Sequence, residues 1–415
     1  MNTSPNASGF GFALLGLTLA LPSMAQADFF EDSKAELELR NYYFNSDFRQ
    51  DNASQSKRDE WAQGLILSYQ SGFTEGPVGF GVDALGLFGL KLDSGPDRQN
   101  SGLLPVGDDK APDDYSRMGA TAKARISKSV LKVGTLIPKL PTVLPSDGRL
   151  LPQTFRGTQL TSTDIDNMTL NAGRLTSNTL RNVSGHDDIE VAGKGIRGGS
   201  PSDQFDFASA SYNWSKNFVT SYHYGGLEKN YKQHIVNLVH TLPIGQGQSI
   251  KTDLRYADSS KDGNTNVDNQ ALGARFTYRI GGHSFGAAWQ SMKGETGFPH
   301  LDGTDSFLVN YVMISADFAS PEEKSWQARY DFDFASVGIP GLTFMTRYLK
   351  GDNFQRSPGV EGTEWERNTD IRYAFQSQAL KNLDVAWRNG SYRSNGSGND
   401  IDQNRLIVSY TLPLL

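Results

Sequence analysis

The chain has 415 residues, no cysteine, and 40 basic against 46 acidic side chains, which leave a formal net charge of −6. Without cysteine it cannot be a disulfide-stapled domain, and the slightly acidic balance gives no general reason to expect a nucleic-acid partner. The mean hydropathy of −0.48 excludes a bundle of transmembrane helices, and no long uncharged apolar span follows Leu21. A membrane β-barrel is compatible with this value, because its strands need only one apolar face.

The first 27 residues have the features of a secretory signal peptide. An apolar run over 10–21 is too short to span a bilayer, and an Ala25-Gln26-Ala27 cleavage site follows it. The preceding residues 1–9 carry no lysine or arginine, which departs from the usual pattern. We predict a signal peptide over 1–27 and a single exported domain over 28–415, because no linker or compositional break divides the remainder.

Alternating apolar and polar side chains recur through the exported part in segments of about ten residues that are rich in aromatic and β-branched side chains. This pattern predicts half-buried strands, and helical periodicity is nowhere sustained. The two segments between 166 and 197 fit the pattern least well. In chain order we predict 18 strands, at 34–44, 60–70, 78–91, 117–127, 130–136, 166–175, 187–197, 204–213, 217–227, 231–241, 248–258, 269–280, 283–292, 325–335, 341–350, 367–377, 382–393 and 404–412.

The connections between these strands alternate between short turns and long loops. Short turns are predicted at 71–77, 127–129, 213–216, 242–248, 281–282, 337–340 and 379–382. Long loops are predicted at 45–59, 92–116, 137–165, 259–268, 293–324, 351–366 and 394–403. An even strand number with this alternation predicts an all-β fold, a transmembrane antiparallel β-barrel in the bacterial outer membrane, surrounded by lipid and lipopolysaccharide.

Strand parity assigns a row of arginines to the barrel interior. Trp326 and Tyr330 alternate with Arg329, and five further strands show the same relation between an apolar set and one arginine. Because successive side chains point to opposite faces, apolar residues on the lipid side put the arginines in the lumen. The predicted ladder is Arg40, Arg329, Arg347, Arg372, Arg388 and Arg405, and the residues Lys123, Arg125, Arg255, Arg275 and Arg279 share its parity.

Such a row suits the stepwise transfer of a carboxylate, because guanidinium groups are always charged and present a fork of donors. At about 4 Å each attraction is worth on the order of 1–4 kcal/mol before desolvation. The alternative is that the arginines only pair with inward carboxylates such as Asp331 and Asp384 and stiffen the wall.

Two of the predicted long loops contain apolar residues that disfavour full exposure to water. The 137–165 segment has four prolines and an Asp147-Gly148 turn among apolar residues, and 293–324 has an apolar stretch at 307–314. We expect these loops to fold inward and narrow the pore, although packing of the first loop outside the barrel is the alternative. The predicted constriction residues are Asp147, Arg149, Arg125, Asp302, Asp305 and Ser306.

One motif resembles a catalytic sequence. Gly282-His283-Ser284-Phe285-Gly286 matches the nucleophile elbow of serine hydrolases, but that elbow needs a strand, a strained turn and a helix. Here a tight turn leads into a strand, so we predict no catalytic residue. The histidines lack metal-ligand spacing, and we expect neither metal nor cofactor. A barrel hydrolase using Ser284 with His283, and a plugged structural barrel, are the alternatives from other classes.

Several long phrases resemble the OprD-type outer-membrane carboxylate channels over the whole exported length. They include residues 39–45 (LRNYYFN), 78–84 (VGFGVDA), 325–330 (SWQARY) and 405–410 (RLIVSY). The resemblance implies an 18-stranded barrel with one pore per monomer, a lumenal basic ladder, inward loops, and passive uptake of small carboxylate-bearing solutes. A homotrimer with one pore per monomer is the assembly that we consider.

Two further segments narrow the resemblance to a subgroup. Residues 134–141 (GTLIPKLP) and 147–154 (DGRLLPQT) are more similar to channels for aromatic and other monocarboxylates, of the benzoate and vanillate kind. The subgroup for basic amino acids and peptides is the alternative within the family.

Overall fold

The computed structural model describes residues 29–50, 53–314, 317–357, 359–395 and 400–415, so the predicted signal peptide lies outside the described residues. Eighteen strands form one antiparallel sheet. They are β1 (Lys34–Phe48), β2 (Lys57–Gln70), β3 (Gly79–Asp93), β4 (Asp114–Ile126), β5 (Ser129–Leu136), β6 (Thr154–Ser162), β7 (Met168–Thr179), β9 (Phe205–Ser215), β10 (Phe218–Leu227), β11 (Tyr231–Gly245), β12 (Gln248–Lys261), β13 (Asp268–Ile280), β14 (His283–Lys293), β16 (Lys324–Asp333), β17 (Leu342–Ser357), β18 (Val360–Ala374), β19 (Leu383–Ser394) and β20 (Ile401–Pro413).

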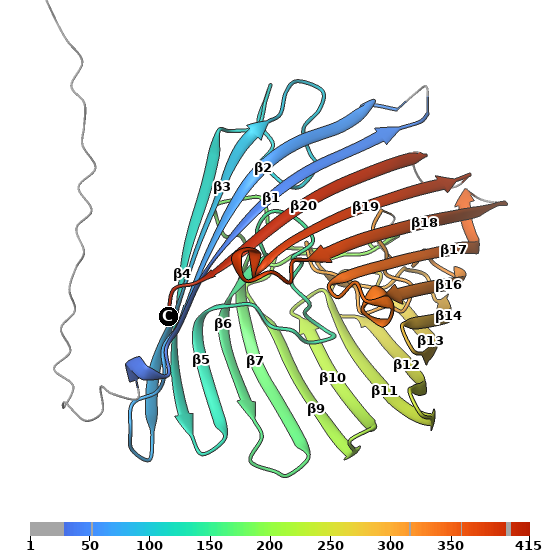
Figure 1. Cartoon of the computed structure of the whole chain (residues 1–415). Coiled ribbons are helices and arrows are strands. Elements are labelled where there is room, and N and C mark those ends of the chain that lie inside the picture. Colours follow the sequence, from blue (N-terminus) through green and yellow to red (C-terminus); the bar gives the residue numbers. More distant parts are fainter. Residues whose placement is uncertain (1–28, 51–52, 315–316, 358, 396–399) are drawn as a thin grey trace, which may run out of the picture.

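The sheet closes on itself. Each strand pairs with the next in this order, and β1 pairs with β20 from Glu36↔Pro413 to Phe48↔Ile401. Figure 1 shows β20, in red, beside β1, in blue. Closure leaves no unpaired sheet edge along this seam, which a membrane-spanning sheet requires. The predicted antiparallel barrel of 18 strands is therefore confirmed.

One predicted strand was wrong and one strand was missed, so the two errors cancel in the strand number. The predicted 351–366 loop was also wrong, because β17 continues to Ser357 and β18 begins at Val360. The 187–197 segment is not a barrel strand, because only β8 (Val191–Ala192) forms there and it pairs with β15 (His300–Leu301). Its apolar alternation arises because this loop is packed in the lumen, where Ile189 is fully buried. Conversely, β6 falls inside the predicted 137–165 loop. Its sequence TFRGTQLTS is mostly polar and shows no clear alternation of apolar and polar residues, so the strand was missed.

The side chains separate into two faces as the parity argument predicted. Large apolar residues such as Trp326, Ile371, Trp387 and Leu406 are exposed on the outer face. Two one-turn 3₁₀ helices, η1 (Phe334–Val337) and η2 (Gln378–Leu380), lie in turns. No helix in the described part of the chain is long and apolar enough to cross a membrane.

The long connections leave one end of the barrel, which we call the loop end, and the short turns lie at the other, the turn end, where β1 begins and β20 finishes. Residues 94–113, 137–153, 180–204 and 294–323 pack against inward side chains of the wall. One cluster joins Leu140, Val143 and Ile189 to Phe205 and Phe207 of β9. A second joins Leu150 and Leu151 to Tyr42 and Phe44 of β1. The loops predicted to fold inward therefore do so.

Candidate functional site

Three adjoining cavities follow the inner wall of the turn-end half of the barrel, from β12 round to β1. Their volumes are about 260, 510 and 1170 Å³. The first two share Arg279 and Arg329, and the second and third share Arg372 and Arg388, so they form one continuous arc. Carboxylates such as Asp253, Asp331 and Asp384 line this space too. We call it the basic arc after its basic residues, which are Lys251, Arg275, Arg279, Arg329, Arg372, Lys381, Arg388, Arg40 and Arg149.

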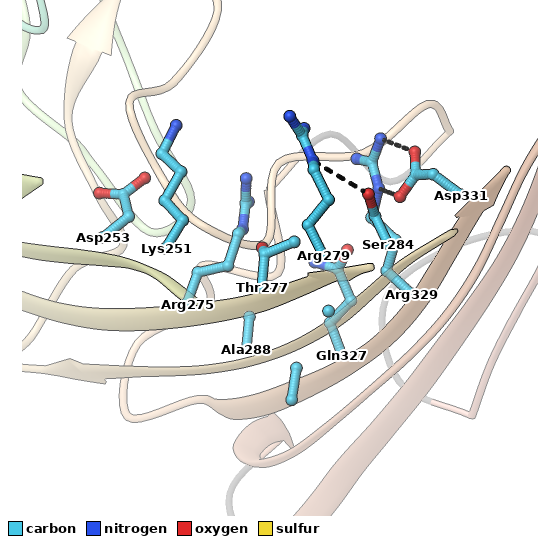
Figure 2. A pocket seen from close by; sticks show the side chains of 12 residues that line it. Lys251, Asp253, Arg275, Thr277, Arg279, Ser284, Ala288, Gln327, Arg329 and Asp331 are labelled. Carbon is cyan, nitrogen blue, oxygen red and sulfur yellow. Dashed lines mark hydrogen bonds and ion pairs between the residues drawn. The ribbon is translucent and has the colours of Figure 1, made fainter. Parts of the chain in front are cut away.

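Figure 2 shows the first part of the arc, where Lys251 of β12, Arg275 and Arg279 of β13 and Arg329 of β16 stand one after another along the wall. In antiparallel strands, residues opposite each other share a face, and Arg329 lies directly opposite Arg347. Arg388 of β19 lies directly opposite Arg405 of β20 in the same way. Of the predicted ladder, Arg40, Arg329, Arg372 and Arg388 line the arc, whereas Arg347 and Arg405 contact the inward loop 294–323.

Four of the six predicted ladder arginines are ion-paired: Arg40, which pairs with Glu38 and Asp147, and three arginines farther round the wall. Arg329 Nη2 lies 2.6 Å from Asp331, Arg372 Nε lies 2.5 Å from Asp384, and Arg388 Nε lies 3.5 Å from Asp370. For these three positions the alternative reading, a wall stiffened by ion pairs, describes part of what the side chains do. By contrast, no carboxylate in the described residues lies within ion-pairing distance of Arg275, Arg279, Arg347 or Arg405.

Three of the four unpaired arginines hold the inward loop 294–323 against the wall. They donate to backbone carbonyl oxygens at alternate loop positions: Arg275 to Val309, Arg347 to Tyr311 at 3.1 Å, and Arg405 to Met313 at 2.7 Å. Two wall glycines make room for this segment. A Cβ on Gly273 would lie 2.9 Å from the Val309 side chain, and one on Gly390 would lie 2.5 Å from that of Met313.

The other inward loop, 137–153, is held by Arg40. Its Nη1 donates to the Asp147 carboxylate at 2.7 Å and to the Arg149 carbonyl oxygen at 2.9 Å, while Nε donates to Glu38 at 2.8 Å. Because its donors are occupied and its side chain is only 12% exposed, Arg40 acts as a loop anchor. Its partner Asp147 is half-exposed and lines the same cavity.

Several charged side chains come together where the two inward loops meet, at the backbone hydrogen bond from Asp305 to Leu144. The Arg149 and Arg405 guanidinium groups lie 5.0 and 5.5 Å from the centre of the Phe44 ring. Burial, and then the proximity of Arg405, lower the pKa of Arg149. Tyr311 donates to Asp305 at 2.6 Å, and burial followed by the Asp305 charge raises the pKa of Tyr311.

Sequence reasoning missed Arg181, which joins this group from the 180–204 loop and donates to Ser146 at 3.1 Å. Burial lowers the pKa of Arg181 as well. Arg181 lies between the predicted strands 166–175 and 187–197, which fitted the alternating pattern least well. Because a loop has no alternating faces, the sequence pattern could not assign a loop arginine to the lumen. Tyr311 was missed for the same reason, although the apolar 307–314 stretch around it was noticed.

The remaining predicted constriction residues take different places. Asp302 contributes its carbonyl oxygen, which accepts from Gln153 at 2.8 Å, and Ser306 is buried. Arg125 lies next to the turn end of β4, with its guanidinium 4.4 Å from the centre of the Phe73 ring. This position is opposite to the end from which the inward loops depart, so we correct the prediction and leave Arg125 out of the constriction.

The hydrolase-like motif does not assemble a catalytic pair. Ser284 faces the basic arc, where its hydroxyl accepts from Arg279 at 3.3 Å. His283 precedes it on the strand and faces the other way, with Nδ1 2.9 Å from the Tyr330 hydroxyl. The nucleophile and its base therefore lie on opposite sides of the wall.

A closed 18-stranded barrel with loops folded into a basic lumen defines an outer-membrane channel of the porin class. A family model described as "outer membrane porin, OprD family" matches residues 27–414. The chain belongs to the OprD family of outer-membrane porins. This membership confirms the prediction of a channel in the bacterial outer membrane rather than an enzyme.

The relatives cover nearly the whole chain. The chain is 38% identical over 407 residues to "Porin-like protein GalP" of Pseudomonas putida, an alignment that covers 96% of this chain and 97% of the relative. Its structure resembles OpdQ of Pseudomonas aeruginosa, with 56% identity, a TM-score of 0.87, and coverage of 94% and 100% of the two chains. It also resembles a BenF-like porin of Pseudomonas fluorescens, with 39% identity, a TM-score of 0.89, and coverage of 93% and 100%.

Proposed function

We propose that the channel takes up small carboxylate-bearing solutes passively, and that aromatic acids of the benzoate and vanillate kind are its preferred class. The observation that carries this proposal is the basic arc, in which arginines of β13, β16, β18, β19 and β1 line one continuous space. A carboxylate moving along it meets a new guanidinium before it leaves the last, so attraction favours entry without trapping the solute.

Aromatic side chains beside the arginines support the preference for aromatic acids. The Arg149 and Arg405 guanidinium groups both lie near the Phe44 ring, and the Phe307 ring lies 4.0 Å from the Arg255 guanidinium. A ring-bearing acid can contact such faces while its carboxylate remains on a guanidinium. The resemblance of 134–141 and 147–154 to the aromatic subgroup and the likeness to a BenF-like porin point the same way.

Uptake into proteoliposomes tests this proposal. We expect benzoate to enter faster than arginine, and the double variant Arg279→Gln/Arg388→Gln to slow benzoate by about thirtyfold, because two attractions of about 1 kcal/mol each are lost. These two arginines line the arc without holding an inward loop. The control is Arg174→Gln, which removes an arginine paired with Asp206 on the outer face. Equal benzoate entry through the double variant and the parent would overturn the proposal.

A channel for basic amino acids or peptides is the second candidate. It is favoured by the carboxylates that also line the arc, among them Asp331, Asp370 and Asp384. Arginine entering faster than benzoate in the same assay would select this candidate.

We also propose a homotrimer with one pore per monomer. Light scattering on the detergent-purified protein, corrected for the mass of bound detergent, measures the number of chains per particle. A mass of three chains is expected, and a mass of one chain at all concentrations would contradict it.

A further inference from the structure

The barrel wall is interrupted between β4 and β7. β5 and β6 have 8 and 9 residues, whereas β4 and β7 on either side have 13 and 12. Pairing between β4 and β5 ends at Thr121↔Gly134, so residues 114–120 of β4 lack a strand partner on that side in the described structure. The loop-end half of the wall is therefore open at this point.

The loop-end parts of β5 and β6 bend into the lumen and pass behind β4. Gly134, with φ of +135°, permits the bend, and a Cβ there would collide with the Ala120 carbonyl oxygen. Beyond it, Leu136 and Phe155 join a hydrophobic cluster inside the barrel. The Thr135 side chain lies against the inner face of β4, 2.6 Å from where a Cβ of Gly119 would stand.

The offset creates a crevice through the wall, which we call the wall crevice. An outer cavity of about 460 Å³ opens on the lipid side, where Met118 is 89% exposed and Val133 is 47% exposed. A small inner cavity of about 40 Å³ reaches Arg117 and the inward residue Leu87. The two cavities share Met118, Gly119, Thr135 and Arg156, so they are continuous.

The charged residues of the wall crevice are all basic. Arg117, Arg156 and His186 line it, and no acidic residue among those described does. Arg117 donates to the carbonyl oxygens of Leu180 and Val183 at 2.7 Å each, and its Nε is buried without a partner in the described structure. The Arg117 charge is therefore surrounded by backbone carbonyl dipoles, and no carboxylate in the described part of the chain pairs with it.

Arg156 is uncompensated in the same way. Its Nη1 lies 3.0 Å from His186 Nε2, and no carboxylate among the described residues lies within ion-pairing distance of it. Arg174, on the neighbouring strand and also facing outward, makes a two-pronged pair with Asp206 at 2.6 and 3.0 Å. The chain thus neutralises one outward arginine and leaves the other available.

The surroundings of the crevice mouth indicate what could occupy it. Towards the turn end the outer face is apolar, with Leu131 and Leu160 exposed beside Val133. Towards the loop end the outward residues are polar, including Ser116 and Thr176. The mouth therefore lies where an apolar belt meets a polar rim, which is the depth of lipid headgroups.

We propose that the wall crevice binds the phosphorylated headgroup of an outer-leaflet lipid, with the phosphate on Arg156 and an acyl chain along Met118 and Val133. A phosphate offers several acceptor oxygens to the free guanidinium donors, and the uncompensated Arg117 adds attraction from within. The apolar mouth accommodates the chain, which a free anion lacks. The site is separate from the basic arc and does not depend on the proposed solute.

Native mass spectrometry of the detergent-purified full-length protein tests the proposal. The probes are diphosphoryl lipid A, a diacylglycerol that has chains but no phosphate, and inorganic phosphate, which has no chains. We expect lipid A to bind more tightly than either, and Arg156→Gln to weaken it by roughly tenfold, the effect of losing one charge-assisted contact. Arg174→Gln is the matched control and should leave lipid A binding unchanged.

A second variant separates loss of binding from loss of folding. Thr158→Glu places a negative charge at the crevice mouth and should also weaken lipid A binding while the barrel keeps its heat-modifiable gel mobility. Equal lipid A binding by Arg156→Gln and the parent would overturn the proposal. Diacylglycerol binding as tightly as lipid A would overturn the role of the phosphate, and inorganic phosphate doing so would overturn the role of the lipid.

Discussion

Glu323 is the last residue of the 294–323 loop and sits in a buried acidic cluster outside the basic arc. Its carboxylate accepts from the Ser320 backbone at 2.8 Å, and Lys194 Nζ lies 3.5 Å from Asp317 and 3.6 Å from Glu364. Burial, and then the nearby charge of Glu364, raise the pKa of Glu323 well above its ordinary value. Two carboxyl groups that lie close together in a buried site repel each other when both are charged, so one of them, here Glu323, tends to keep its proton.

This raised pKa predicts a pH dependence of stability. The folded chain keeps a proton on Glu323 that the unfolded chain releases, so the contribution is complete below the ordinary glutamate pKa and is lost as pH rises through the raised value. Acidification from pH 8 towards 5 should therefore raise the unfolding temperature measured by gel mobility in detergent.

The substitution Glu323→Gln should flatten this dependence, because an amide is neutral at every pH. Glu322→Gln is the control, since Glu322 is the exposed neighbour that accepts from the Gly294 backbone at 2.8 Å. The same pH slope in Glu323→Gln and the parent would show that another group is responsible.

At the scale of elements, the lumen is shaped by loops that wall arginines hold in place. Alternate carbonyl oxygens of the 309–313 segment meet arginines of β13, β17 and β20, and Arg40 of β1 holds the 137–153 loop. These arginines face the pore, and they also affect its width because they hold the inward loops in place. Removing one of them therefore changes both the charge and the geometry, and a test has to separate the two effects.

Arg40→Ala should release the 137–153 loop, because about 1–2 kcal/mol of charge-assisted anchoring is lost. We expect higher single-channel conductance with more frequent fluctuations, measured in planar bilayers. Arg388→Ala is the matched control, since it removes the same charge from the same cavity without touching an inward loop. Equal conductance changes in the two variants would mean that charge alone, and not the loop, controls the current.

At the scale of the whole molecule, the seam between β1 and β20 turns the sheet into a barrel. Thirteen residue pairs join these strands, which are nearly a full chain length apart in sequence. Ser46 and Gln403 lie opposite each other near its loop end, both facing inward. Because the chain has no cysteine, each of two introduced cysteines can form an intramolecular disulfide only with the other.

The double variant Ser46→Cys/Gln403→Cys should form an intramolecular disulfide, because directly opposed antiparallel residues lie within the required separation. Closing so long a loop should raise the unfolding temperature, by an amount corresponding to about 2–4 kcal/mol, under oxidising but not reducing conditions. Peptide mapping identifies the bond, and Ser46→Cys alone is the control. Cross-linked dimers without an intramolecular bond would contradict the closure.

The sequence by itself determined the class of fold and the face of each ladder arginine. Side-chain alternation is a local property of a strand, so Arg329, Arg347 and Arg405 could be placed in the lumen without knowing which strands are neighbours. The strand number follows from equally local patterns. The same reliance on alternation explains the two errors, because β6 is polar and the packed 187–197 loop alternates.

Only the tertiary structure decided what those arginines touch. The positions of Arg181, Tyr311 and Asp305, the loop carbonyl oxygens on Arg347 and Arg405, and the crevice at Arg156 all depend on contacts between residues far apart in the chain. Such contacts depend on how loops pack inside a closed wall, which no periodic pattern encodes. The charge of the lumen was therefore readable from the sequence, whereas the shape of the path through it was not.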